Sequence, residues 1–122
     1  MEKVECSSMK DGNGSIRKYF DFESIRMMLG VNYVDTEGWH MHAEAHQIIY
    51  VISGALRVFA KNKVDEIPNC VIIVKDEFLS LPAGEWHNVT PNIEGTKILV
   101  LKYHSNKTNI IKSLKEDYIG MK

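Results

Sequence analysis

Short apolar segments separated by turn residues constrain the fold of this chain more than any other feature. Turn signals such as Ser53-Gly54, Pro68-Asn69 and the PAG sequence at 82–84 divide them. Regularly spaced short strands of this kind are typical of an antiparallel sandwich or barrel, not of βαβ units. The sequence therefore predicts an all-β protein with strands at 17–20, 27–33, 47–52, 56–60, 70–74, 78–81, 88–89 and 97–103.

The C-terminal end follows a different pattern. Apolar residues recur there at spacings of three and four, which predicts one apolar stripe of a helix. We expect Ser105 or Asn106 to cap this helix, and we expect the helix to pack on the barrel without contributing to chemistry. The stripe consists of Ile110, Ile111, Leu114, Tyr118 and Ile119.

These patterns divide the chain of 122 residues into three parts. Residues 1–16 are polar and contain the turn sequence DGNGS, so we expect a flexible N-terminal arm. The β-barrel is expected over 17–104, and the C-terminal helix and tail over 105–122. This length suits a single domain.

The charge balance gives no sign of a polyanionic partner. Fifteen basic residues face sixteen acidic ones, for a net charge of -1, so we expect no nucleic-acid or membrane partner. No apolar run approaches the roughly 20 residues that span a bilayer. The first five residues lack the apolar stretch of a signal peptide, and Cys6 and Cys70 lie far apart. We therefore expect a cytoplasmic protein with two free thiols.

Three predicted strands are apolar on both faces: 48–52, 71–74 and 98–101. A sheet with one face in water would alternate instead. One face of each strand is expected to line the barrel interior, and the terminal helix can cover part of the other face. Because one short helix cannot cover three strands, the sequence predicts a second subunit, most simply in a homodimer.

Three histidines stand out by their spacing. His40 and His42 form an HxH sequence, and residues i and i+2 of a strand point to the same face. His87 follows the turn sequence PAGEW and arrives from a different predicted strand. Three imidazoles that converge in this way can bind a metal ion. His104 lacks such a context, so we expect it to have a structural role.

The two stretches that carry these histidines resemble the two motifs of the cupin superfamily. WHMHAEAHQIIYVISG at 39–54 resembles the first motif, G-x5-HxH-x3,4-E-x6-G, and DEFLSLPAGEWH at 76–87 resembles the second, G-x5-PxGxxH-x3-N. They occur in the expected order inside the predicted barrel, and the joint match is more specific than either motif alone. The chain thus resembles a small single-domain cupin.

This resemblance implies a double-stranded β-helix, or jelly-roll barrel, with one divalent transition metal ion in its mouth. Carried over position by position, the metal ligands would be His40, His42, Gln47 and His87. Gln47 is aligned by counting back from Gly54. The resemblance leaves the metal open among Fe, Mn, Ni, Zn and Cu.

The chain departs from the family pattern at several positions. Gln47 stands where the family usually has Glu, Val34 and Asp76 replace motif glycines, and Pro91 replaces the final Asn. A neutral amide leaves the ion its full charge, so this site should retain metal less tightly and prefer an anionic ligand. Two alternatives stay open: that Gln47 does not ligate, and that a local bulge turns His46 inward to replace it.

Other side chains near the motifs carry weaker hypotheses. Glu44 and Glu85 can act as general acid or base if they are desolvated, although solvated loop carboxylates are more common. Trp39 and Trp86 can stack on a substrate or pack on the outer sheet. Arg57 can reach an anion or lie on the surface.

Two functions follow as expectations. The first is a metal-binding cupin that acts on a small anionic or sugar-like molecule; if it is an enzyme, it would be a dioxygenase, isomerase or lyase, with catalytic residues unassigned. The second is a non-catalytic binding or sensing module that resembles the ligand-binding domains of AraC-type regulators. The single helix after 105 leaves no room for their helix-turn-helix domain.

Overall fold

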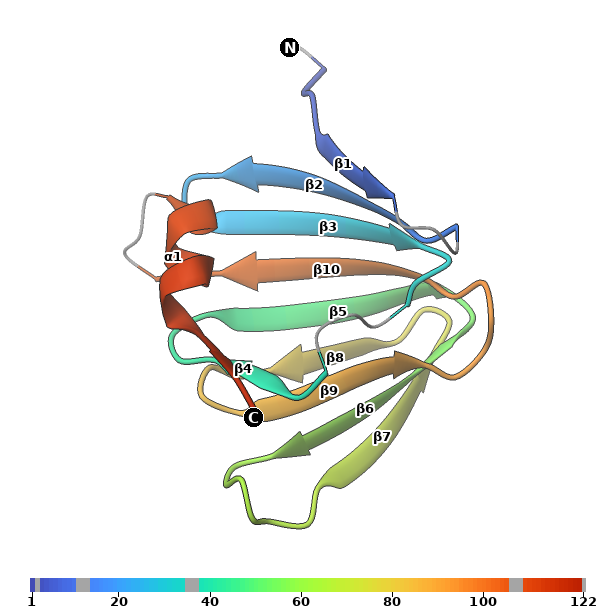
Figure 1. Cartoon of the computed structure of the whole chain (residues 1–122). Coiled ribbons are helices and arrows are strands. Elements are labelled where there is room, and N and C mark those ends of the chain that lie inside the picture. Colours follow the sequence, from blue (N-terminus) through green and yellow to red (C-terminus); the bar gives the residue numbers. More distant parts are fainter. Residues whose placement is uncertain (2, 11–13, 35–37, 106–108, 122) are drawn as a thin grey trace.

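A computed structural model describes residues 1, 3–10, 14–34, 38–105 and 109–121. It confirms the predicted all-β architecture with one C-terminal helix (Figure 1). The elements are β1 (Ser7–Lys10), β2 (Ile16–Phe22), β3 (Ile25–Val31), β4 (His40–His42), β5 (His46–Ser53), β6 (Ala55–Lys61), β7 (Asn69–Val74), β8 (Phe78–Leu81), β9 (Trp86–Pro91), β10 (Lys97–Tyr103), α1 (Ile110–Asp117) and β11 (Tyr118–Gly120).

The strands form two antiparallel sheets that enclose one core. The six-stranded sheet has the order β1-β2-β3-β10-β5-β8, and the five-stranded sheet has the order β11-β4-β9-β6-β7. One apolar cluster joins the inner faces of both sheets, for example Ile49 and Ile98 from the first with Leu56 and Val89 from the second. Each fully buried aliphatic side chain of this kind stabilises the fold by about 1.5–3 kcal/mol.

Strand β5 shows why this sequence forms a barrel wall. Gln47, Ile49 and Val51 are buried, while the alternate residues His46 and Ile48 are exposed. Because successive side chains of a strand point to opposite faces, Gln47 is directed into the barrel in line with the core residues. The register of β5 therefore fixes which polar side chain reaches the interior.

Two turns keep the geometry that the motif positions require. Gly54, between β5 and β6, has a φ of 88°, and a Cβ atom there would lie 2.4 Å from Thr96 Oγ1. Only glycine fits such a position. Asp76 replaces a motif glycine, yet it adopts a φ of 69°, a region that Asp tolerates better than most residues. The second motif thus keeps its turn despite the substitution.

Both ends of the chain differ from the expectations. The segment predicted as a flexible arm contains β1, which pairs with β2 from Ser7 opposite Tyr19 to Lys10 opposite Ile16. The helix begins after Asn109, whose side chain caps it by accepting a hydrogen bond from the Lys112 N–H. The chain then forms β11, a strand that the helical pattern did not predict.

The buried face of α1 also differs from the predicted stripe. Its buried residues are Ile110, Ser113, Leu114 and Asp117, whereas Ile111, Tyr118 and Ile119 are exposed. Ile110 and Leu114 pack on Ala45, just before β5, and the Ile110 N–H bonds to the Glu23 carbonyl in the β2–β3 turn. The helix therefore covers one end of the barrel instead of the outer face of a sheet (Figure 1).

No helix in the described ranges is long and apolar enough to cross a membrane.

Candidate metal centre

Strands β4 and β9 bring two histidines into contact. In this antiparallel pair His40 lies directly opposite His87, so both side chains project from the same face of the sheet. Their ring centres are 4.3 Å apart, and the two Nε2 atoms are 3.1 Å apart. Both rings are buried.

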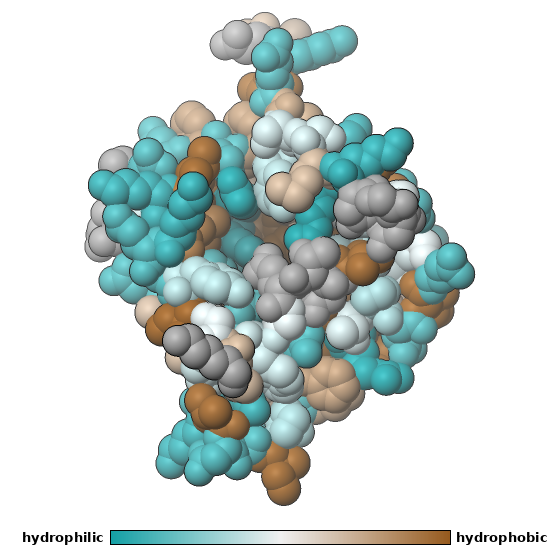
Figure 2. Space-filling view, viewed as in Figure 1, coloured by the Kyte–Doolittle hydropathy of each residue, from teal (hydrophilic) through white to brown (hydrophobic). Residues whose placement is uncertain are grey.

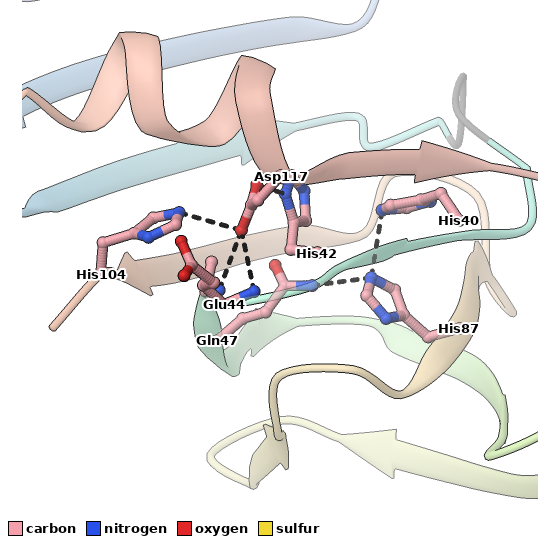
Figure 3. Close-up of polar contacts among 8 residues, drawn as sticks. His40, His42, Glu44, Gln47, His87, His104 and Asp117 are labelled. Atoms are coloured by element: carbon pink, nitrogen blue, oxygen red, sulfur yellow. Dashed lines mark hydrogen bonds and ion pairs between the residues drawn. The ribbon is translucent and has the colours of Figure 1, made fainter.

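His42 and Gln47 complete the group. His42 shares its strand face with His40, and the two ring centres are 5.7 Å apart. Gln47 reaches across from β5 in the other sheet, and its Nε2 lies 2.9 Å from His87 Nε2. Both side chains are buried. The structure thus brings together the four residues that the motifs single out (Figure 3).

The hydrogen bonds at the far side of each ring fix its tautomer. His40 Nδ1 lies 3.0 Å from the Gly38 carbonyl, His87 Nδ1 lies 3.0 Å from the Glu85 carbonyl, and His42 Nδ1 lies 2.7 Å from Asp117 Oδ1. Carbonyl and carboxylate oxygens can only accept, so each Nδ1 carries the proton and each neutral ring keeps a lone pair on Nε2. This is the usual arrangement around metal-binding histidines.

Burial favours the neutral form of two of the rings, His87 and His42. It lowers the pKa of His87 from 6.5 to about 4, with smaller contributions from the neighbouring His40 and His42 rings and from Lys102. It also lowers the pKa of His42, against the opposing effect of the hydrogen bond to Asp117. Metal ions bind only the neutral form of imidazole.

The donor set fits a metal ion in two respects. His42 Nε2 is buried without a hydrogen-bond partner among the described residues, so this ring has a lone pair that no protein donor uses. Two nitrogens 3.1 Å apart would subtend about 95° at an ion with metal–nitrogen distances of about 2.1 Å, between the octahedral and tetrahedral angles.

The His42 ring lies farther from His40 than the His87 ring does. Within the described residues, no three His, Cys, Asp or Glu side chains stand as close together as the ligands of a formed metal site. The closest contacts in the group are those of His87 with His40 and with Gln47, and glutamine is not among these four residue types. Gln47 presents nitrogen to His87, so ligation through its oxygen requires a half-turn of the amide.

Two residues that the sequence analysis left out of the site lie beside it. Asp117, at the end of α1, contacts His42 through Oδ1, and its Oδ2 lies 3.0 Å from His104 Nε2. The helix therefore places a carboxylate beside the candidate site, a contact that the helical pattern did not predict. The detectable signal was an acidic residue three positions after Leu114 on the buried stripe.

The other histidine and the two glutamates have different environments. His46 is exposed on the opposite face of β5, and its Nδ1 accepts a hydrogen bond from the Ala83 N–H; no bulge turns it inward. The Glu44 side chain is exposed, and its backbone N–H donates to Asp117. Glu85 is half-buried, and this burial raises the pKa of its carboxyl group.

The tryptophans and Arg57 have packing or surface roles. Trp39 lies 6.4 Å from the Phe59 ring, between ring centres, with Lys61 Nζ over its face at 4.4 Å. Trp86 is buried, on the strand face opposite that of its neighbour His87. Arg57 is exposed and donates to Asn92 Oδ1.

A cavity of about 80 Å³ adjoins the group inside the barrel. His40, Gln47 and His87 line it together with three cationic side chains, those of Arg17, Arg26 and Lys102. None of the described residues that line it is acidic. A second, more open hollow of about 460 Å³ is lined by His42 and shares Arg26 and Lys102 with the first. On the face viewed in Figure 2, the molecule is hollowed near its centre.

No protein-family model matches this sequence, and no curated protein matches it. Solved structures do match in fold. BH2720 from Bacillus halodurans is 20% identical with a TM-score of 0.65, and the match covers 76% of this chain and 73% of that one. Oxalate decarboxylase from Bacillus subtilis is 13% identical with a TM-score of 0.69, over 96% of this chain and 30% of that one.

The iron(II) form of HppE is a third structure with this fold. It is 10% identical, with a TM-score of 0.65, and the match covers 81% of this chain and 56% of HppE. These proteins are cupin β-barrels, and this chain has the cupin fold, as the two sequence motifs predicted.

Proposed function

We propose that this protein is a small metal-dependent cupin in which His40, His42, Gln47 and His87 hold one divalent transition metal ion, and that it acts on a small anionic molecule. The observation that carries the proposal is the set of three buried imidazoles. Each has its Nδ1 engaged by an oxygen acceptor, which leaves Nε2 as the atom available to a metal ion. The Nε2 atoms of His40 and His87 are 3.1 Å apart; with both Nδ1 atoms protonated neither Nε2 can donate to the other, and a cation bound by both would remove this repulsion.

Imidazole and amide donors suit Fe, Mn, Ni, Zn and Cu alike. Iron(II) is the first ion to test, because it is named with one of the structural neighbours. A bound ion would polarise a coordinated oxygen or, if redox-active, support chemistry with dioxygen. The protein's own part is to hold the ligands neutral, to orient the substrate and to keep water from the apolar side of the cavity.

The cationic lining supports an anionic substrate. Lys102 lies opposite Gln47 in the β10–β5 register, beside the metal group. The guanidinium of Arg17 is held over the Tyr33 ring and donates to the Val34 carbonyl, so its orientation is fixed. The charge of Arg26 is shared with Asp21. An anion entering between these groups would meet positive charge on the way to the ion.

The cavity also limits substrate size. A volume of about 80 Å³ accommodates on the order of five water-sized groups, since one water needs about 10–15 Å³ by the same measure. Small carboxylates and keto acids are therefore better candidates than intact sugars. No residue is assigned as the catalytic acid or base.

The alternative is a non-catalytic module that binds a small anion. One observation favours it: the Gln47 amide donates to His87 Nε2, so part of the group is satisfied without an ion. Incubation of the metal-loaded protein with small carboxylates discriminates between the two functions. Turnover of any of them supports the enzyme, whereas binding without turnover across the panel supports the module.

Replacing Gln47 with glutamate tests the ligand set and the charge argument together. A carboxylate at this position lowers the charge of the site by one, so we expect Gln47→Glu to bind Zn²⁺ or Fe²⁺ about tenfold more tightly and to bind a probe anion such as malonate more weakly. Titration calorimetry measures both. Gln47→Met, which has similar size but no oxygen ligand, should weaken metal binding instead. Equal metal affinity in all three proteins would show that residue 47 is not a ligand.

We further propose that the protein forms a homodimer through the outer face of the six-stranded sheet. Two apolar rows cross this face from strand to strand. Met27, Ile48 and Phe78 are each at least 40% exposed there, and α1 leaves the face uncovered. A continuous apolar sheet face is typical of an interface. The rows are Phe20–Met27–Leu101–Ile48 and Leu29–Leu99–Tyr50–Phe78.

Light scattering tests the dimer. At micromolar concentration we expect twice the chain mass of 14.0 kDa, and Ile48→Glu should return the protein to the monomer because it buries a charge in the interface. Ile93→Glu, at another exposed apolar position, serves as the matched control and should leave the mass unchanged. A wild-type mass of one chain would refute the dimer.

A further inference from the structure

The C-terminal segment, from Asp117 through β11, contacts the strand that carries His40 and His42. We infer that Asp117 is a positioning residue, which sets the tautomer and orientation of His42, and that β11 holds the HxH strand in place. The consequence for metal affinity rests on the proposed function, whereas the consequence for His42 itself does not.

The first Asp117 oxygen, Oδ1, forms a hydrogen bond with the His42 ring. Oδ1 lies 2.7 Å from His42 Nδ1, and both side chains are buried. Because the carboxylate can only accept, it holds the proton on Nδ1 and leaves the lone pair on Nε2, the buried atom without a partner. An imidazole bonded to a carboxylate is a stronger electron donor to a metal than one bonded to a carbonyl.

The second oxygen fixes the carboxylate. Oδ2 accepts from the Ala45 N–H at 3.0 Å and from the Glu44 N–H at 3.2 Å, and His104 Nε2 lies 3.0 Å from it. The two donors come from the β4–β5 loop, and His104, which follows β10, lies against the same oxygen without a hydrogen bond (Figure 3). A carboxylate held from several sides has little freedom to rotate, so the ring that it contacts is held as well.

The backbone of the segment supports the same strand. β11 pairs with β4, with Tyr118 opposite His42 and Gly120 opposite His40. The Tyr118 ring stacks on the His40 ring at 5.5 Å with an interplanar angle of 23°. The Ala43 N–H also bonds to the Asp117 carbonyl. Residues more than 70 positions away in the sequence thus complete the surroundings of the HxH pair.

The charge of Asp117 has a further consequence. In the family pattern a glutamate ligand would supply one negative charge, and Gln47 does not supply it. Asp117 places a carboxylate against His42 instead, so its negative charge would lie directly behind one ligand of a bound ion. All four proposed ligands therefore stay neutral, while the carboxylate of Asp117 partly offsets the positive charge of a bound ion through His42.

The test is the protonation state of the His42 ring. In metal-free wild-type protein, long-range ¹H–¹⁵N spectra of the five histidines, assigned with His42→Gln, should show His42 with its proton on Nδ1. In Asp117→Asn the tautomers should mix, and metal affinity should fall by about 10- to 100-fold. Asp117→Glu should restore part of the affinity, because it keeps the charge. Glu116→Gln, an exposed neighbour on the same helix, should match the wild type.

Each result decides a separate point. A His42 ring protonated on Nε2 in the wild type overturns the inference, and this measurement does not depend on whether any Asp117 variant folds. An Asp117→Asn protein with the wild-type tautomer and affinity overturns it too. If the wild type binds no metal while its His42 tautomer still responds to Asp117→Asn, the proposed function fails and the positioning role stands.

Discussion

His87→Ala is expected to weaken the binding of a divalent metal ion at least a hundredfold. His87 Nε2 lies 3.1 Å from His40 Nε2 and 2.9 Å from the Gln47 amide, so it is the point at which the two sheets meet around the group. Loss of a residue that only supports a ligand already costs 10- to 100-fold, and loss of a ligand should cost more. Competition against a chelator of known affinity, with Zn²⁺ or Fe²⁺, measures the change.

His46→Ala is the matched control. This histidine is exposed on the other face of β5, so its removal should leave metal affinity within about twofold of the wild type. If both variants bind metal as the wild type does, or if the wild type binds no ion under conditions that load other cupins, the metal proposal is wrong. A loss of metal affinity in His46→Ala but not in His87→Ala would show that the metal binds at the outer face of the sheet.

The barrel strands could be predicted because strand periodicity and turn residues are features of short sequence segments. In β5 the alternation of buried and exposed residues follows the two-residue period of a strand, and the turns carry residues that suit them, such as Gly54. The same period places His40 and His42 on one face. Only the motif spacing, not periodicity, indicated that His87 would approach the HxH pair, and its position opposite His40 could not be predicted because the pairing of β4 with β9 is non-local.

The parts that could not be predicted depend on long-range contacts. The polar segment Ser7–Lys10 has no apolar pattern, and it is a strand because β2 offers it an edge to pair with. From the sequence alone Asp117 is expected to be a solvated helix carboxylate, whereas in the fold His42 and His104 lie against it. Burial of a charged side chain is stable only with such partners, and a single sequence does not show which residues they are.

The metal-free protein should lose about 3 kcal/mol of folding free energy through His87 between pH 7 and pH 4. Burial lowers the pKa of this ring from 6.5 to about 4 in the folded state. Between these two values the unfolded chain binds more protons than the folded one, so stability rises with pH across this window and is lost as the pH falls. A difference of one pKa unit corresponds to about 1.36 kcal/mol. The lowered pKa of His42 acts in the same direction.

Urea unfolding of chelator-treated protein across this pH range measures the effect. Carboxylates elsewhere also titrate there, so the informative quantity is the difference between the wild type and His87→Gln, which keeps a polar side chain but cannot be protonated. The wild type should lose about 3 kcal/mol more than this variant on going from pH 7 to pH 4. Parallel curves for the two proteins would mean that His87 is protonated as easily in the folded chain as in the unfolded one. The ring would then not be the buried, neutral donor that the proposed metal site requires.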